Sequence, residues 1–412
     1  MKLVLSHPTG NANVRAVAES LVKGNRLHQF YTSIAAYPGN FWQQIGRISA
    51  LSEFRRRSFS PDLQAYTKLY PWREIGRAIA LKFQLKKLIV HETGYFCVDK
   101  VYQSIDQHVA NSLHKAVKNG AKAVYAYEDG ALETFIEAKK LGLRCIYDLP
   151  IAYWETGRQL MMEEAIRLPQ WAITLGGGIK DSPAKLERKT KELELADIVV
   201  GPGSFVMNSL PEWAKQKTKI VSPFGSPISQ KPQKQHNDNR PLRVLFVGSM
   251  GQRKGLGDLF AAMNLLHSKN IELVVLGSLL APMEFYRSEY SHFTYEKGRP
   301  HNDVLALMQS CDVFCLPSIV EGRALVMQEA MSQGLPIIIT PNTGGDDLVI
   351  EGETGFLVPI RSPEAIAEKL LWFIENRSKI PQMGINAYIK SQTYTWEMYG
   401  NTISQNISTI IS

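Results

Sequence analysis

Short runs of hydrophobic residues alternate with helix-like segments along the first 225 residues of the chain. Helical periodicity covers residues 12–22 and 183–194, and buried-strand patterns occupy residues 2–6, 123–127, 144–147 and 198–200. Each apolar run ends in a polar or glycine-containing loop, as do parallel strands covered by helices on both faces. The pattern predicts a doubly wound, Rossmann-like α/β domain over residues 1–225.

A second alternation of the same kind follows a polar segment. Residues 226–241 are rich in Pro, Gln, Lys and Asn and almost free of apolar residues, which is typical of a linker. Strand-like runs then recur at residues 243–248, 271–277, 312–317 and 336–340. A chain of 412 residues, 44% of them hydrophobic, can fill two separate cores. We therefore expect a second Rossmann-like domain over residues 242–385, facing the first across a cleft.

The net charge of +8 is concentrated toward the N-terminus. Residues 1–100 contain 15 lysines and arginines against 6 aspartates and glutamates, and the basic residues are densest at 54–57 and 70–87. Helical spacing does not collect them on one face. The charge is compatible with an ordinary solvated surface or with loose docking to anionic lipid headgroups. No helix-turn-helix, zinc or ribonucleoprotein motif accompanies it, so nucleic-acid binding is not expected.

Cysteine usage and hydropathy bear on the cellular compartment. Cys97, Cys145, Cys311 and Cys315 are too few and too scattered for a disulfide framework, and the last two flank a buried-strand pattern. No long apolar segment opens the chain, and no apolar run reaches membrane-spanning length. We expect a cytoplasmic protein, associated at most peripherally with the inner face of a membrane.

The loop after the first strand of the second domain has the composition of an anion-binding site. The strand ends at Gly248, and Ser249 leads to the adjacent cations Arg253 and Lys254 before a helix begins. Glycine lets backbone approach an anion, a guanidinium can bind two oxygens at once, and an ammonium acts as a mobile point charge. The alternative is a tight strand-to-helix turn with two exposed cations.

Two glutamates bracket the start of a later helix in the same domain. Glu321 precedes the helix, and Glu329 lies about a turn inside it. A phosphate at the helix N-terminus would have one acid on each side, and a sugar nucleotide fits this arrangement because its hydroxyls seek carboxylate acceptors. The alternative is a solvated loop acid and an ordinary surface residue.

Together these motifs resemble a known family of enzymes. The run 246–255, the pair Glu321 and Glu329, and Gly-Glu-Thr-Gly-Phe-Leu-Val-Pro at 352–359 are similar, in the same order, to the retaining glycosyltransferases of family 4, also called group 1 glycosyltransferases. The resemblance implies the GT-B architecture of two Rossmann-like domains, with the acceptor bound by the first. It also implies that residues 386–412 form a helix that packs back on the first domain.

The same resemblance implies a donor site in the C-terminal domain for a nucleoside-diphosphate sugar. Arg253 and Lys254 would hold the diphosphate, Glu329 the ribose hydroxyls, and Glu321, as a catalytic residue, the transferred sugar. The implied donor-binding residues are Gly248, Ser249, Arg253, Lys254, Arg323, Ala324, Leu325 and Glu329.

The chain departs from the family pattern in three places. Many relatives carry arginine where Ser249 stands, so diphosphate binding depends more on the two cations that follow. The usual Gly-Phe-Gly-Leu reads Gly-Arg-Ala-Leu, in which Arg323 either alters the sugar selected or points into solvent. A strand that often ends in His-Asp ends here in Tyr-Asp, which leaves Asp148 as a weaker catalytic candidate.

Two N-terminal loops supply candidates for the acceptor side of the cleft. In the first, Gly10 would permit close approach to the donor phosphate, and Asn11 or Asn13 would supply polar contacts; a helix entry turn capped by Asn11 is the alternative. In the second, Glu128 and Asp129 would orient or activate an acceptor hydroxyl, or would complement a helix dipole.

No Asp-x-Asp motif of the kind that holds a divalent ion across a diphosphate occurs in the chain. We therefore expect metal-independent hexosyl transfer, with no cofactor, from a nucleotide sugar to a glycan or lipid-linked acceptor. Retention of anomeric configuration is implied by the family resemblance. The alternatives are a sugar-nucleotide epimerase and a non-catalytic GT-B protein that binds a glycan or an assembly partner.

Overall fold

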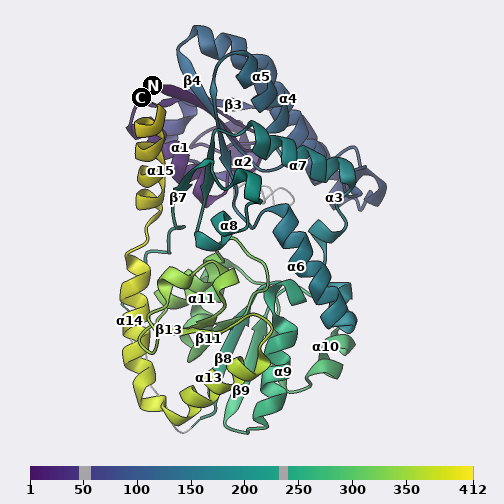
Figure 1. Cartoon of the computed structure of the whole chain (residues 1–412), viewed down its shortest axis with the longest axis vertical. Helices are drawn as coiled ribbons and strands as arrows, with labels where there is room; N and C mark the ends of the chain where they lie inside the picture. The colour runs from purple at the N-terminus through teal and green to yellow at the C-terminus, as the bar shows by residue number, and fades with distance from the viewer. Residues whose placement is uncertain (46–56, 232–239, 412) are drawn as a thin grey trace.

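The computed structural model describes residues 1–45, 57–231 and 240–411, so Phe54, Arg55 and Arg56 of the basic segment lie outside the described residues. The chain forms two α/β domains, one above the other in Figure 1. Each domain is built on one sheet in which the paired strands run parallel. The predicted fold class, two Rossmann-like domains, is confirmed.

The N-terminal domain contains a seven-stranded sheet in the order β3-β2-β1-β4-β5-β6-β7. Its strands are β1 Lys2–Ser6, β2 Leu27–Thr32, β3 Thr67–Leu69, β4 Ala121–Tyr127, β5 Arg144–Asp148, β6 Ile198–Gly201 and β7 Thr218–Val221. Its helices are α1 Ala12–Lys23, α2 Phe41–Ile45, α3 Trp72–Lys82, α4 Val98–Lys118, α5 Leu132–Lys140, α6 Trp154–Arg167, α7 Pro183–Leu195 and α8 Ser204–Asn208.

Strand β1 shows why this sheet is covered on both faces. Leu3 and Leu5 belong to the core that contains residues of α1 and α15, whereas Val4 belongs to the core that contains residues of α4 and α5. Successive side chains of a strand point to opposite faces, so an unbroken apolar run needs a core on each side. The sequence pattern that predicted a doubly wound sheet has this physical origin.

The C-terminal domain contains a six-stranded sheet in the order β10-β9-β8-β11-β12-β13. Its strands are β8 Leu242–Val247, β9 Ile271–Leu276, β10 Phe293–Glu296, β11 Val313–Leu316, β12 Ile337–Ile339 and β13 Gly355–Leu357. Its helices are α9 Leu256–Leu266, α10 Met283–Glu289, α11 His301–Gln309, α12 Leu325–Ser332, α13 Pro363–Glu375 and α14 Ile380–Gln392. Counted within the domain, this strand order is 3-2-1-4-5-6, the order of dinucleotide-binding folds.

The last helix, α15 (Trp396–Ile411), returns to the N-terminal domain and lies against α1, so both chain ends lie at the same end of the molecule (Figure 1). Tyr399, Ile403 and Ile407 are buried there. The chain returns to the N-terminal domain later than the expected boundary at residue 386, because α14 continues to Gln392 and packs on α12 of the C-terminal domain.

One segment that precedes the linker packs on the C-terminal domain. Helix α6 reaches down beside α9 and α10 in Figure 1, and the 3₁₀ turn η4 (Pro169–Thr174) follows it. Trp171 is 1% exposed within the C-terminal core, and its indole N–H donates to Glu289 at 2.8 Å. The Arg167 guanidinium forms two hydrogen bonds, of 2.8 and 2.9 Å, with the buried Asp258 carboxylate. The predicted N-terminal domain, residues 1–225, thus contributes part of the C-terminal core.

None of the helices within the described ranges combines the length and apolar character that crossing a membrane requires.

Candidate active site

The two sheets bring their strand ends together at the interdomain cleft. In the C-terminal domain the strand order reverses between β8 and β11, and the loops after these two strands carry Arg253, Lys254 and Glu321. In the N-terminal domain the order reverses between β1 and β4, and the loops after them carry residues 7–13 and 128–131. Crevices at such reversals are where open α/β sheets bind ligands.

Glu321 holds both predicted cations. Its Oε1 atom accepts a hydrogen bond of 2.6 Å from Arg253 Nη1 and forms an ion pair with Lys254 Nζ. Burial lowers the pKa of Lys254, and the negative charge of Glu321 acts in the opposite direction. The structure therefore joins the two glycosyltransferase-like motifs in one cluster of two cations and one carboxylate.

The predicted position of Glu329 relative to its helix agrees with the structure. Helix α12 begins at Leu325, with Ala324 at the N-cap position, so Glu329 lies one turn inside and Glu321 precedes it. Glu329 Oε1 lies 3.1 Å from His301 Nε2, a partner that helical spacing could not have indicated. The contacts of Glu329 do not include Glu321 or the two cations.

Arg323 neither points into solvent nor contributes a free cation to the donor site. Its guanidinium is fully buried and binds Asp347 through Nη1–Oδ1 (2.6 Å) and Nη2–Oδ2 (3.2 Å). It also donates to the carbonyl of Gly344 at 3.0 Å and to the Gln328 side chain at 2.8 Å, and it lies over the ring of Tyr394. Arg323 therefore fixes the loop between Glu321 and α12.

Asp148, the second predicted catalytic residue, is a buried carboxylate at the end of β5. It is 1% exposed, and the Tyr125 hydroxyl donates to it at 2.5 Å. Burial raises its pKa to about 7, although hydrogen bonds from Tyr125 and Tyr399 lower it. In this structure the side chain is closed off from the cleft, so a structural role is the role that its contacts support.

The loop after β1 is organised by His7, which the sequence analysis did not select. Its Nδ1 accepts the backbone N–H groups of Thr9 (3.0 Å) and Gly10 (2.9 Å), which leaves the ring proton on Nε2. Burial lowers the pKa of His7 to about 3, with a smaller contribution from Arg57, so the ring is neutral. The sequence signal that could have indicated His7 was its position as a polar residue directly after the first strand.

The three predicted residues of this loop have different surroundings. Gly10 has a φ of +63°, and a Cβ there would meet the Phe59 ring at 2.1 Å, so glycine is required by the turn and its packing. Asn11 occupies the N-cap position of α1, but its side chain accepts from the Thr9 hydroxyl instead of capping the helix. Asn11 and Asn13 both line a cavity of about 550 Å³ on the acceptor side, and Gly10 does not.

Glu128 and Asp129 line the same cavity and lie beside cations of α7. Asp129 binds Arg188 at 2.8 Å, and Glu128 lies 3.4 Å from Lys189 Nζ. Burial raises the pKa of Glu128, and Lys189 opposes that shift. Glu192 fixes this loop, because its carboxylate accepts hydrogen bonds from the backbone N–H groups of Asp129 and Ala131.

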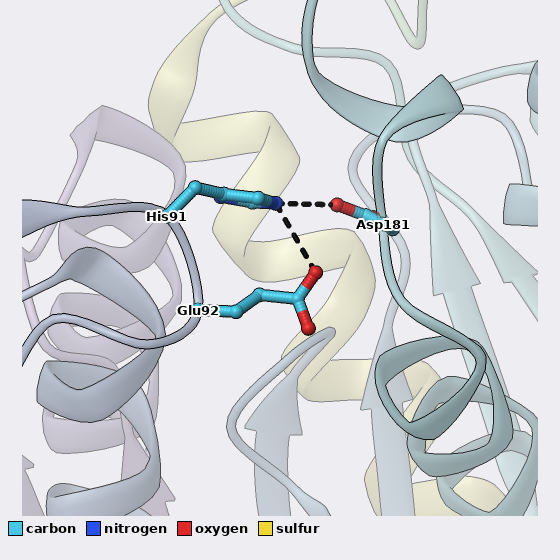
Figure 2. Close-up of side chains that lie close together, drawn as sticks. All are labelled: His91, Glu92 and Asp181. Carbon is cyan, nitrogen blue, oxygen red and sulfur yellow. Dashed lines mark hydrogen bonds and ion pairs between the residues drawn. The ribbon is translucent and has the colours of Figure 1, made fainter.

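His91, Glu92 and Asp181 form a further polar cluster at the cleft (Figure 2). His91 Nε2 lies 2.9 Å from Asp181 Oδ1 and 3.3 Å from Glu92 Oε1. Lys185 Nζ lies 3.3 Å from the same Asp181 oxygen, so an ammonium already balances this carboxylate. His91 and Asp181 line a second cavity of about 400 Å³, which also borders Ser249 and Arg253 and thus faces both domains.

Two hydrogen bonds join the N-terminal domain to the Glu321 loop and to the loop at Asp346. The Ala152 N–H donates to the Glu321 carbonyl at 3.3 Å, and the Ser204 hydroxyl donates to Asp346 at 2.9 Å. A Cβ at Gly322 would lie 1.8 Å from the Pro150 carbonyl oxygen, so only glycine allows this approach.

The C-terminal part of the chain is similar in sequence to known glycosyltransferases. Residues 227–390 match the family described as "Glycosyl transferases group 1". The capsular polysaccharide biosynthesis glycosyltransferase CapM of Staphylococcus aureus is 32% identical over 165 residues, which cover 39% of this chain and 43% of CapM. The chain's matches span less than half the length of each of the first three curated relatives.

Solved structures match over the whole chain. Sucrose-phosphate synthase from Thermosynechococcus elongatus aligns with a TM-score of 0.64 and 18% identity, covering 100% of this chain and 99% of that protein. Anabaena Alr3699/HepE in complex with UDP aligns with a TM-score of 0.61 and 14% identity, covering 99% of this chain and 100% of that protein. The chain thus has the two-domain GT-B fold, and its residues 227–390 match the group 1 glycosyl transferases.

Proposed function

We propose that this protein transfers a hexosyl group from a nucleoside-diphosphate sugar to a glycan or lipid-linked acceptor, with retention of anomeric configuration. The observation that carries the proposal is the cluster of Arg253, Lys254 and Glu321 at the reversal point of the C-terminal sheet. Its support is the match of residues 227–390 to group 1 glycosyl transferases. Retention is taken from the resemblance to family 4.

The charge of the cluster suits a diphosphate that is becoming a leaving group. Two cations face one carboxylate, so the ligand-free cluster carries one net positive charge. An incoming diphosphate competes with Glu321 for Arg253 and Lys254, and the released carboxylate can then accept hydroxyls of the sugar. As the bond between the anomeric carbon and the phosphate oxygen breaks, the two fixed cations stabilise the charge that develops on phosphate.

The proposed transfer needs no oxidant, reductant or further reactant. The acceptor hydroxyl forms the new bond to the anomeric carbon on the face that the phosphate leaves, and its proton passes to a departing phosphate oxygen. Glu128 and Asp129 line the acceptor-side cavity and would orient the acceptor hydroxyls. We propose that Arg253 and Lys254 make a divalent ion unnecessary and that the enzyme works in the cytoplasm, associated at most peripherally with the inner face of a membrane.

The first test is a thermal shift assay with UDP, GDP, ADP and CDP on the wild type, Lys254→Met and the matched control Lys369→Met. Lys369 is a lysine of α13 that pairs with Glu368. We expect one nucleoside diphosphate to stabilise the wild type and Lys369→Met. Its affinity for Lys254→Met should be at least about tenfold lower, because one charged contact contributes ~1.5–3 kcal/mol. Equal stabilisation of all three proteins would refute the assignment of the donor site.

A second test follows the chemistry with the sugar nucleotide of the selected base, with and without EDTA. Transfer that survives EDTA and gives a retained anomer by NMR supports the proposal, and an inverted anomer contradicts retention. Conversion of the donor to an isomeric sugar without acceptor would identify an epimerase. Binding without any turnover would favour the non-catalytic alternative.

A further inference from the structure

Seven consecutive residues at the C-terminal end of α3 are exposed. Residues 81–87 read Leu-Lys-Phe-Gln-Leu-Lys-Lys, and we call this segment the α3 tip. Its apolar residues Leu81, Phe83 and Leu85 are 44%, 64% and 46% exposed. Helix α3 lies at the edge of the upper domain away from α15 in Figure 1. One exposed apolar residue is ordinary, but three within seven residues form a patch of the kind that marks an interaction site.

Two residues of α3 extend this apolar surface along the helix. Trp72 and Ile79 are 70% and 47% exposed, and their helical spacing places them on the same face as Phe83. Glu74, the acidic residue of α3, lies on the opposite face, where it is buried and 3.8 Å from Arg77. The outward face of α3 therefore presents apolar side chains and no carboxylate.

The three lysines of the α3 tip have no acidic partner. Within the described ranges, none of Lys82, Lys86 and Lys87 forms an ion pair with a carboxylate. Residues 78–90 contain these three lysines and no aspartate or glutamate. The Lys82 ammonium lies 5.8 Å from the centre of the Phe83 ring, so the charges and the apolar side chains share one patch. Such a patch is complementary to a surface that is anionic outside and apolar beneath.

The directions of the apolar side chains favour a bilayer over a groove on another protein. Leu81 and Phe83 are two positions apart, so they do not face the same way at the end of a helix. A protein groove covers one face of a helix, whereas lipid can surround an inserted segment on every side. Lysine stems can lie beside the apolar residues while their ammonium groups reach the headgroups. This geometry also explains why helical spacing does not collect the cations on one face.

We propose that the α3 tip docks the protein on an anionic phospholipid bilayer, with its apolar side chains below the headgroups and its lysines against the headgroup phosphates. The inference rests on the proposed function for the peripheral association with a membrane, to which it assigns a surface and a lipid class. His91, which lines both cleft cavities, follows Lys87 by four residues, or at most about 14 Å of extended chain. Docking at the tip therefore holds the mouth of the cleft close to the bilayer.

The test is sedimentation of the full chain with vesicles of phosphatidylcholine alone, or with about one third phosphatidylglycerol, at low and at high salt. We expect the wild type to bind the anionic vesicles at low salt and to be released at high salt. Lys86→Gln/Lys87→Gln should bind roughly 25-fold more weakly, because each lysine near an anionic surface contributes about fivefold. Phe83→Ser should bind about tenfold more weakly, because it removes a side chain that the lipid buries.

The matched controls remove the same chemistry elsewhere on the surface. Ile166→Ser replaces an 81% exposed residue of α6. Lys118→Gln/Lys122→Gln removes two exposed lysines near the far end of α4, about 30 Å along that helix. Both controls should bind like the wild type, and losses equal to those of the tip variants would overturn the inference in favour of a diffuse charge or apolar effect.

Insertion is measured with an environment-sensitive fluorophore on Leu85→Cys, since the four native cysteines are buried. Its emission should shift to the blue with anionic vesicles, and the same label on Ile166→Cys should not respond. An unshifted label at residue 85, equal binding to neutral vesicles, or no binding by the wild type overturns the inference. Nucleotide stabilisation is measured in every variant: vesicle binding without it contradicts the proposed donor site and leaves the docking surface supported, whereas stabilisation without vesicle binding contradicts only the α3 tip.

Discussion

Replacing Asp148 by asparagine separates a structural role from a catalytic one. Asp148 is buried, and burial raises its pKa from the ordinary 3.8 to about 7, against the opposing hydrogen bonds from Tyr125 and Tyr399. Asparagine has nearly the same shape and cannot ionise. It therefore mimics the protonated side chain that the folded protein prefers below neutral pH.

The expected effect on stability follows from this pKa shift. Below pH 3.8 the carboxyl is protonated in both the folded and the unfolded chain, and it imposes no cost. Between pH 3.8 and about 7 the unfolded chain releases this proton more readily than the folded chain, so the group destabilises the fold increasingly as pH rises. Above pH ~7 the destabilisation is constant. A shift of about three pKa units corresponds to ~4 kcal/mol, of which about 3 kcal/mol develops between pH ~5 and pH ~8.

The assay is denaturant unfolding of both proteins at pH ~5 and pH ~8, with sugar transfer measured in parallel. We expect Asp148→Asn to gain about 3 kcal/mol relative to the wild type between the two pH values and to retain transfer. Asp197→Asn is the control. Burial opposes ionisation of Asp197, but the Cys145 N–H and Lys139 lower its pKa. The Asp197→Asn protein should therefore be destabilised by the same amount at both pH values. A pH-independent difference for Asp148→Asn would refute the burial argument, and a folded but inactive variant would restore a catalytic role.

Three further substitutions test other parts of the structure. Arg323→Gln should destabilise the C-terminal domain by about 2 kcal/mol and weaken binding of the selected nucleoside diphosphate, since it removes the charged hydrogen bonds of a buried guanidinium to the partly exposed Asp347; unaltered unfolding and nucleotide affinity would contradict this role. Trp171→Ala should lower the stability of the C-terminal domain by ~3–5 kcal/mol in calorimetry, whereas Ala at the half-exposed Trp213 should have little effect; equal effects would contradict the packing of η4 on that domain. Trp72→Ser should reduce sedimentation with anionic vesicles at low salt, and undiminished binding would exclude α3 as the contact.

The parts of the site that could be predicted from the sequence are those determined by neighbouring residues. The strand before Arg253, the strand before Glu321 and the helix that contains Glu329 each follow from local hydrophobic spacing. The resemblance to family 4 implied that the two cations and Glu321 belong to one donor site, and parallel strands place their following loops at one edge of the sheet. The structure adds the specific ion pairs, which depend on strand order.

The parts that could not be predicted depend on partners far along the chain. Arg323 was expected to be exposed or at the sugar because its neighbours are loop residues, but its carboxylate partner lies 24 residues later. Asp148 follows a strand end, as a catalytic acid would, but Tyr125 and the distant Tyr399 enclose it. His91 meets Asp181 across 90 residues. Local periodicity contains no information about such pairings.

The α6–η4 segment shows how the same long-range contacts constrain the active site. Arg167 and Trp171 join this segment to the C-terminal domain through an ion pair with the buried Asp258 and through a core aromatic, both costly to break. Between this segment and β5, Ala152 donates to the backbone of the Glu321 loop at 3.3 Å. Rotation of the N-terminal sheet relative to the C-terminal sheet would therefore strain the backbone that follows β5, next to the residue that holds Arg253 and Lys254. We expect such a rotation to lengthen the contact between Ala152 and the Glu321 loop.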